Sequence, residues 1–366
     1  MNKYPNLLAE IGLTQSEINA RIDDVFHAIF EDDCERFYFE TEGDAGYMLD
    51  TGNFDARTEG MSYGMMMAVQ MDRKELFDRL WVFAKRHMWN AAGPYHGYFA
   101  WSARPDGRPN FSGPAPDGEE YFAMALFFAS ARWGEGAPPF DYATQARDIL
   151  RHAIHQHELV PGGQTMWDLE TALIKFVPDL PFSDPSYHLP HFYERFAIHA
   201  DPGDRAFWQR AARASRAYLP KACHPVTGLA PEYAHLDGTP ETGHGHGDFF
   251  SDSYRVAMNI GLDSAWNGPR HEYRMIADRI QAFLWNREPY KTYTIDGTSK
   301  EPIALHPTAI IATAAAASLA TDTPLSRQWV RKFWETPLRK GERRYYDNCL
   351  YFFCLLMLAG RYKQLA

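Results

Sequence analysis

Three acidic residues stand at the openings of apolar, aromatic-rich segments, where charged side chains are uncommon. They are Glu59, Asp117 and Asp252, and each has glycine or serine beside it and a tyrosine within four residues. Asp and Glu seldom border a buried apolar run without a reason, so the repetition predicts a pocket built from helix starts. Paired carboxyl groups beside aromatic rings are what the hydrolysis of a bond between two sugars requires.

Such hydrolysis needs one carboxyl group that carries a proton and one that is ionised. Asp252 has Arg255 three residues later on the same helix face, and a cation and a helix N-terminus both favour the ionised carboxylate. Glu59 precedes the methionine-rich residues 61–67, an apolar wall that disfavours charge, although Arg57 and the helix dipole oppose this effect. We interpret Glu59 as the proton donor and Asp252 as the base that activates water.

The alternative to a catalytic role is that each acid is simply a helix N-cap, a common structural use of Asp at a helix start. It is strongest for Asp117, because Glu119 and Glu120 behind it fit a first helical turn. Trp101 lies in a predicted loop and could stack on a sugar ring, or it could anchor that loop in the core. Tyr187 opens another buried segment, so its hydroxyl could reach the same pocket, unless it is an ordinary core tyrosine.

Histidine-rich segments raise the question of a metal. The side chains concerned are His188, His191, His244, His246 and Asp248. They lack the spacing of a zinc-binding HExxH motif. Three glycines make the segment around 244–248 look like a flexible loop. The sequence also lacks the phosphate-binding, dinucleotide-binding and nucleophile-elbow motifs. We therefore expect no metal and no cofactor.

Composition excludes several classes of protein. The 366 residues carry a formal net charge of −10 without a basic run, which disfavours nucleic acid as a partner. No uncharged apolar stretch is long enough to cross a membrane, and the first residues lack the apolar core of a secretory signal. Four cysteines without CxxC spacing, Cys34, Cys223, Cys349 and Cys354, are expected to be buried free thiols in the cytoplasm.

The periodicity is helical almost throughout, and two kinds of helix alternate. Apolar segments begin near residues 59, 118, 185, 250, 306 and 345, and amphipathic segments lie near 15–30, 72–88, 142–157, 204–219, 268–285 and 326–334. Apolar helices must be buried, whereas amphipathic helices face water on one side. The pattern predicts an all-α, double-layered (α/α)6 barrel with six inner and six outer helices, as a single domain over residues 1–366. All inner helix starts would then fall at one mouth, which would bring the three acids together.

Several long motifs resemble those of glycoside hydrolase family 8, and especially its reducing-end xylose-releasing exo-oligoxylanases. They are residues 61–67 (MSYGMMM), 113–122 (GPAPDGEEYF), 184–190 (DPSYHLP), 250–255 (FSDSYR) and 343–347 (RRYYD). The resemblance extends from about Asp44 to Gly360. It implies an (α/α)6 barrel and an inverting mechanism, in which the two carboxyl groups are about 6.5–9.5 Å apart so that water fits between base and sugar.

The resemblance also implies a role for individual residues. Glu59 matches the general acid, Asp252 the general base, and Asp117 a third acid that binds and helps to distort the sugar. Tyr187 matches the tyrosine that helps to hold the attacking water. The other matches are Arg255 and Trp101, at the substrate site, and His306, in a kink at 305–307 that closes the site beyond one sugar.

The implied substrate is a short β-1,4-xylo-oligosaccharide, from which single xylose units are released at the reducing end. Three alternatives remain open from the residues. The first is an endo-acting xylanase, glucanase or chitosanase with the same fold. The second is a sugar epimerase, which would use histidine pairs instead of acids. The third is an oligosaccharide-binding protein without catalysis, which would need no acid pair.

Overall fold

The structure, a computed structural model, describes residues 4–41 and 43–366. Within these residues the chain forms two compact units, and the boundaries between the units fall inside helices or loops. Unit 1 comprises residues 4–28, 181–191 and 214–362, and unit 2 comprises 29–41, 43–180, 192–213 and 363–366. The expectation of a single domain over residues 1–366 stays a prediction.

Unit 1 is mainly helical. It contains α1 (Leu7–Glu10), most of α2 (Gln15–Phe30), α9 (Arg255–Asn267), α10 (His271–Leu284), α11 (Pro307–Ala316), α12 (Pro324–Glu335) and α13 (Arg344–Leu358), with short 3-10 helices η2 (Pro185–Tyr187), η3 (Ser251–Tyr254) and η4 (Ala317–Ala320). Strands β5 (Phe182–Ser183) and β6 (Ala234–His235) pair antiparallel, and β7 (Asp248–Phe249), β8 (Lys291–Thr294) and β9 (Ser299–Ile303) form an antiparallel sheet in the order β7-β8-β9.

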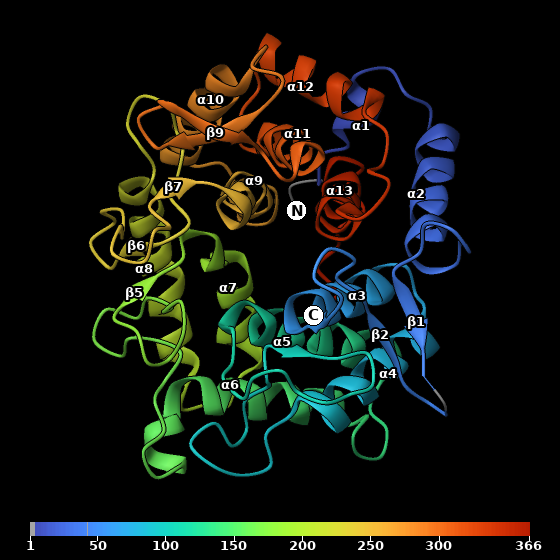
Figure 1. Cartoon of the computed structure of the whole chain (residues 1–366), viewed down its shortest axis with the longest axis vertical. Helices are drawn as coiled ribbons and strands as arrows, with labels where there is room; N and C mark the ends of the chain where they lie inside the picture. The colour runs from blue at the N-terminus through green and yellow to red at the C-terminus, as the bar shows by residue number, and fades with distance from the viewer. Residues whose placement is uncertain (1–3, 42) are drawn as a thin grey trace. The chain divides into compact units, whose positions relative to one another are not determined.

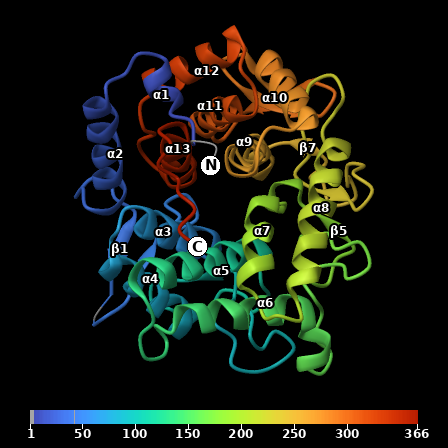
Figure 2. The same ribbon diagram turned by 180° about the vertical axis from the view of Figure 1, so that it is seen from behind.

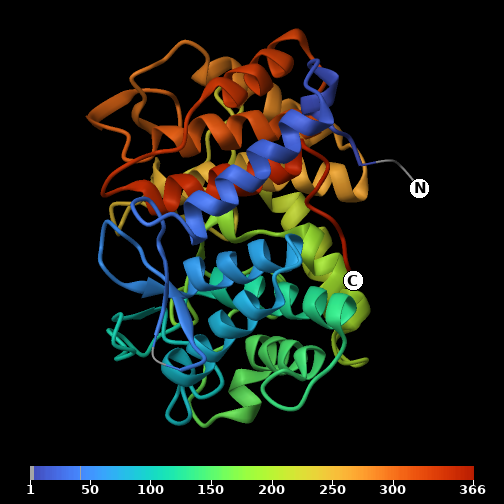
Figure 3. The same cartoon turned by 90° about the vertical axis from the view of Figure 1, so that its right-hand side faces the viewer.

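Helices α9, α11 and α13 form the core of unit 1, because they are apolar on nearly every face. Figure 1 shows α11 and α13 side by side. Helix α9 packs so closely on the junction of α11 and η4 that a Cβ at Gly261 would lie 2.3 Å from the carbonyl oxygen of Ala316. Figure 3 shows α2, in blue, along α13, in red, and the rings of Phe26 and Phe352 are 6.1 Å apart there.

Unit 2 is built around α3 (Thr58–Gln70) and α5 (Pro116–Trp133), which are also apolar on nearly every face. Figure 2 shows α3 beside α5 and α5 beside α6. The other elements are α4 (Lys74–Phe83), which continues as a π-helical turn η1 (Ala84–Met88), α6 (Tyr142–Leu159), α7 (Pro190–His199), the first half of α8 (Arg205–Ala222), and strands β1 (Tyr38–Glu40), β2 (Gly46–Met48), β3 (Ala56–Arg57) and β4 (Ser102–Ala103). Strand β1 pairs with β2 and β3 pairs with β4, both antiparallel.

The expected alternation of helix types is confirmed. Helices or 3-10 turns begin at 58, 116, 185, 251, 307 and 344, close to the six predicted apolar starts. The amphipathic segments correspond to α2, α4, α6, α8, α10 and α12. The short strands were not predicted, and one cysteine prediction was wrong, since Cys34 is exposed while Cys223, Cys349 and Cys354 are buried.

None of the helices in the described part of the chain is both long enough and apolar enough to cross a membrane.

Candidate active site

Each of the three acids is the second residue of its helix. Glu59 follows Thr58 at the start of α3, Asp117 follows Pro116 in α5, and Asp252 follows Ser251 in η3. The N-caps are instead Arg57, Ala115 and Phe250, all in extended conformation. The N-cap alternative is therefore wrong for all three acids. At the second position of a helix, the positive end of the helix dipole still stabilises an ionised carboxyl group.

Unit 2 brings Glu59 and Asp117 to neighbouring helix starts. A Cβ at Gly118 would lie 2.4 Å from the Cβ of Thr58, so only glycine allows α5 to approach α3 this closely. Thr58 precedes Glu59, and Gly118 follows Asp117. Asp117 is buried, with Oδ1 accepting a hydrogen bond of 2.9 Å from the amide of Gly118, whereas Glu59 is half-buried.

Trp101 belongs to the same part of unit 2. Its carbonyl oxygen accepts a hydrogen bond of 2.9 Å from the amide of Thr58, which fixes the loop beside Glu59. The guanidinium of Arg57 lies 5.3 Å from the centre of the Trp101 ring. Phe111 stacks nearly parallel on that ring, with centroids 5.4 Å apart, and is itself 58% exposed. The loop thus presents two aromatic rings, of which sequence reasoning found only Trp101.

Two further acids hold this loop in place. The Nε atom of Arg57 lies 3.0 Å from Oδ1 of Asp55 and 3.2 Å from Oδ2 of Asp50. The second oxygen of Asp55 accepts a hydrogen bond of 2.6 Å from Ser102 in β4. This network ties β3 to β4 directly before Glu59, and nothing in the local sequence pattern revealed it.

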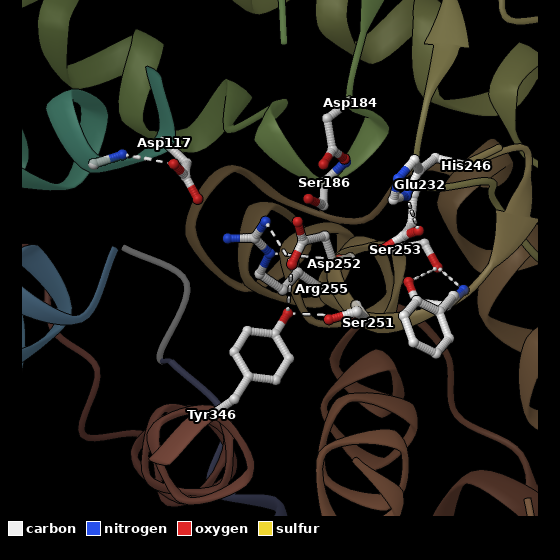
Figure 4. A network of polar contacts seen from close by, with 12 residues as sticks. Asp117, Asp184, Ser186, Glu232, His246, Ser251, Asp252, Ser253, Arg255 and Tyr346 are labelled. Atoms are coloured by element: carbon white, nitrogen blue, oxygen red, sulfur yellow. Dashed lines mark hydrogen bonds and ion pairs between the residues drawn. The ribbon is translucent and has the colours of Figure 1, made fainter. Parts of the chain in front are cut away.

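In unit 1, Asp252 and Arg255 form an ion pair. One guanidinium nitrogen of Arg255 lies 3.5 Å from Oδ1 of Asp252, and the side chain of Arg255 is almost completely buried. The same guanidinium lies 5.5 Å from the centre of the Tyr187 ring. Tyr346 makes long hydrogen bonds to Oδ1 of Asp252 (3.4 Å) and to the carbonyl oxygen of Ser251 (3.3 Å), as Figure 4 shows. The aspartate is therefore held by a cation and a phenol.

His306 extends this set. It is the N-cap of α11, and its Nδ1 lies 3.1 Å from Oδ2 of the buried Asp347. Its ring packs on Tyr346 with centroids 4.8 Å apart. Since Tyr346 contacts Asp252, the structure joins four predicted site residues of unit 1 through direct contacts, namely Tyr187, Asp252, Arg255 and His306.

Sequence reasoning missed two buried acids near Asp252. Asp184 caps η2, with Oδ1 accepting a hydrogen bond of 2.7 Å from the amide of Ser186. Burial first, and then the charge of Asp252, raises the pKa of Asp184 well above its usual value. For Glu232, the same two causes and the charge of Asp184 raise the pKa to about 9. Asp184 stands inside the DPSYHLP motif, which was the available signal, whereas Glu232 lies in a long loop without one.

Three of the four histidines considered as metal ligands form hydrogen bonds to protein side chains. His246 Nδ1 lies 2.8 Å from Oε2 of Glu232, and His244 Nδ1 lies 2.9 Å from Oε2 of Glu241. His188 bonds two serine hydroxyls, and burial lowers its pKa to about 3.

Glu119 lies in the first turn of α5, as the sequence predicts. Its side chain is turned inward and accepts a hydrogen bond of 3.0 Å from the amide of Phe99. Burial raises the pKa of Glu119 to about 8, so the group is mainly neutral at pH 7.

Comparison with known proteins assigns the chain to a family. The family described as glycosyl hydrolases family 8 matches residues 32–360. The chain belongs to this family. It is therefore a glycoside hydrolase, and the predicted all-α (α/α)6 fold class is confirmed.

Three relatives at 48–55% identity are named reducing-end xylose-releasing exo-oligoxylanases, whereas three at 26–27% identity are named endoglucanases. The reducing end xylose-releasing exo-oligoxylanase of Halalkalibacterium halodurans is 55% identical, covering 99% of this chain and 94% of the relative. The enzyme of the same name from Bifidobacterium adolescentis is 48% identical, covering 98% and 96%. A crystal structure of a reducing-end-xylose releasing exo-oligoxylanase complexed with xylose has a TM-score of 0.97 and 55% identity, covering 99% of this chain and 97% of that one.

Proposed function

We propose that this family 8 enzyme hydrolyses short β-1,4-xylo-oligosaccharides and releases one xylose at a time from the reducing end. The observation that carries the proposal is the 55% identity, over 99% of this chain, to an enzyme of that name. The acids at second helix positions and the aromatic rings beside them fit the chemistry of that reaction.

In the proposed mechanism, Glu59 donates its proton to the glycosidic oxygen as the bond between that oxygen and the anomeric carbon breaks. Asp252 accepts a proton from a water molecule whose oxygen bonds to the same carbon from the opposite face. The products are xylose and an oligosaccharide shortened by one sugar, with inverted configuration at the anomeric carbon. No cofactor takes part in these steps.

The other site residues would bind the substrate. Tyr187 would hold the attacking water, and its contact with Arg255 supports a fixed position for its ring. Asp117 would bind and distort the sugar at the cleavage point. Trp101 would stack on a sugar ring. His306 and the kink at 305–307 would block the space beyond one sugar.

Timed product analysis on xylotetraose labelled at its reducing end tests the proposal. Labelled xylose should be the first labelled product, and proton NMR should show the inverted anomer at the newly formed reducing end. Labelled xylobiose as the main early product would instead indicate an endo-acting enzyme. Conversion of free xylose without hydrolysis would indicate an epimerase.

We also propose a cytoplasmic location and one catalytic domain over residues 1–366. Three buried free thiols, Cys223, Cys349 and Cys354, support a reducing compartment. Cell fractionation with antibodies against the protein would test the location.

A further inference from the structure

Asp184 is a completely buried carboxyl group with only one oxygen in a hydrogen bond. Oδ1 caps η2 through the amide of Ser186, while Oδ2 has no hydrogen-bond partner among residues 4–41 and 43–366. The hydroxyl of Ser186, also buried, has none within the same residues. Figure 4 shows Asp184 and Ser186 next to the carboxyl group of Asp252. Two such polar atoms at one place mark a site for a bound water.

The charges around Asp184 decide whether its carboxyl group is protonated or ionised. Asp252, Asp184 and Glu232 influence one another, and Arg255 supplies positive charge to all of this set. The ion pair of Arg255 goes to Asp252, whose side chain is 29% exposed. A second and third buried negative charge there would be costly, so the two buried acids, Asp184 and Glu232, are the ones that hold protons.

Other ionisable groups near Asp184 do not change this conclusion. Tyr218 and Tyr233 both respond to its charge, but burial raises the pKa of each phenol, so both are neutral. His188, on the same turn, is neutral as well, because burial lowers its pKa to about 3. His246 reaches Glu232, not Asp184.

We propose that Asp184 is a positioning residue that stays protonated and, together with the hydroxyl of Ser186, binds a water molecule against the carboxylate of Asp252. This inference rests on the base role proposed for Asp252. No proton leaves Asp184 during the reaction. Its O–H donates a hydrogen bond to this water, and the water donates one to the carboxylate of Asp252, which orients the base and stabilises its negative charge. A neutral carboxylic acid thereby supports a charged one.

Two substitutions separate this role from capping. Asp184→Asn keeps a neutral donor and the cap, whereas Asp184→Ser keeps a good N-cap but is too short to reach the water. We expect Asp184→Asn to keep kcat on xylotriose within about threefold and to leave the acid limb of the pH profile in place. We expect Asp184→Ser to lower kcat by about tenfold or more, with little change in KM, since a hydrogen bond to a charged group is lost.

Two kinetic outcomes would overturn the proposal. If Asp184→Ser retained the wild-type kcat, the residue would be a cap and nothing more. If Asp184→Asn moved the acid limb to lower pH by about one unit, the wild-type residue would be ionised, because a negative charge beside the base would have been removed.

An infrared difference spectrum tests the protonation without any substrate. At neutral pH, wild type minus Asp184→Asn should contain the carbonyl band of a protonated carboxylic acid. Asp296→Asn is the control and should lose no such band, since hydrogen bonds from Thr294 and Thr298 lower the pKa of Asp296 to about 2. A difference spectrum without the band would overturn the proposal even if xylose release were confirmed. The band would stand even if the substrate proved different.

Discussion

Arg255 lies 3.5 Å from Asp252, and its side chain is only 3% exposed. Such a pair contributes little net stability, because removing a guanidinium from water costs much of what the attraction returns. Its value is positional, since the same guanidinium also faces the ring of Tyr187. The pair therefore fixes the proposed base, Asp252, and the neighbouring Tyr187 relative to each other.

Replacing Arg255 by lysine should separate the effect of its positive charge from the effect of its planar shape. Arg255→Lys keeps the positive charge but loses the planar group that faces both Asp252 and Tyr187. We expect kcat on xylotriose to fall by about tenfold or more, with a loss of about 1–3 kcal/mol in the free energy of unfolding, because the guanidinium is buried. Arg274→Lys, at a side chain 61% exposed, is the control. Steady-state kinetics and urea unfolding measure both quantities, and wild-type kcat would contradict the expectation.

Substitution of Glu59 and of Asp252 tests the proposed acid–base mechanism directly. Glu59→Ala and Asp252→Ala should each lower turnover of xylotriose by about 10²-fold to 10⁴-fold, the usual contribution of general acid–base assistance. Circular dichroism should show both variants folded. Glu75→Gln, on an exposed side chain, should keep full activity. Near-native turnover by either alanine variant would remove the role assigned to that residue.

The helix starts could be predicted from the sequence because two independent signals agree there. Apolar periodicity marks the buried segments, and Pro116 and Pro307 stand at first helical positions, where proline is favoured. Glu59 and Asp252 could be selected as candidate site residues for the same reason, since an acid in an apolar first turn is uncommon.

The buried acids behind the site could not be found in this way. Glu232 contacts His246 and Asp248, which lie in a later part of the same long loop, so no periodic pattern marks it as buried. The strands have two to five residues, too few for alternation to show. The inward turn of Glu119 likewise depends on the amide of Phe99, in a different loop.

Gly118 should be essential to the packing of α3 against α5. Gly118→Ala places a methyl group 2.4 Å from the Cβ of Thr58, so the two helix starts must move apart. We expect the free energy of unfolding to fall by about 1–3 kcal/mol and kcat to fall with it, because Glu59 and Asp117 follow these starts. Gly203→Ala is the control, since its Cβ would meet nothing within 4 Å. Urea unfolding of both variants measures the difference, and equal stability would contradict the expectation.

Glu119 should make stability depend on pH. Burial raises its pKa in the folded protein to about 8 from the ordinary 4.5, so the folded state binds the extra proton between these values. Stability from this group is complete below pH 4.5 and is lost as pH rises to about 8, with a slope of up to about 1.4 kcal/mol per pH unit. Glu119→Gln keeps the acceptor for Phe99 and removes the slope. Urea unfolding at pH 5, 7 and 8.5 measures the effect, with the exposed Glu272→Gln as control. A slope unchanged in Glu119→Gln would show that another group causes it.

His306 tests the release of single sugars. It packs on Tyr346 and bonds Asp347, so its ring is held in one position at the start of α11. If this ring and the kink at 305–307 block the space beyond one sugar, His306→Ala should open that space. We then expect labelled xylobiose, besides labelled xylose, among the early products from reducing-end-labelled xylotetraose. Leu319→Ala, in η4 and away from this kink, is the control and should release xylose alone. A product pattern that stays pure xylose in His306→Ala would assign the single-sugar limit to other residues.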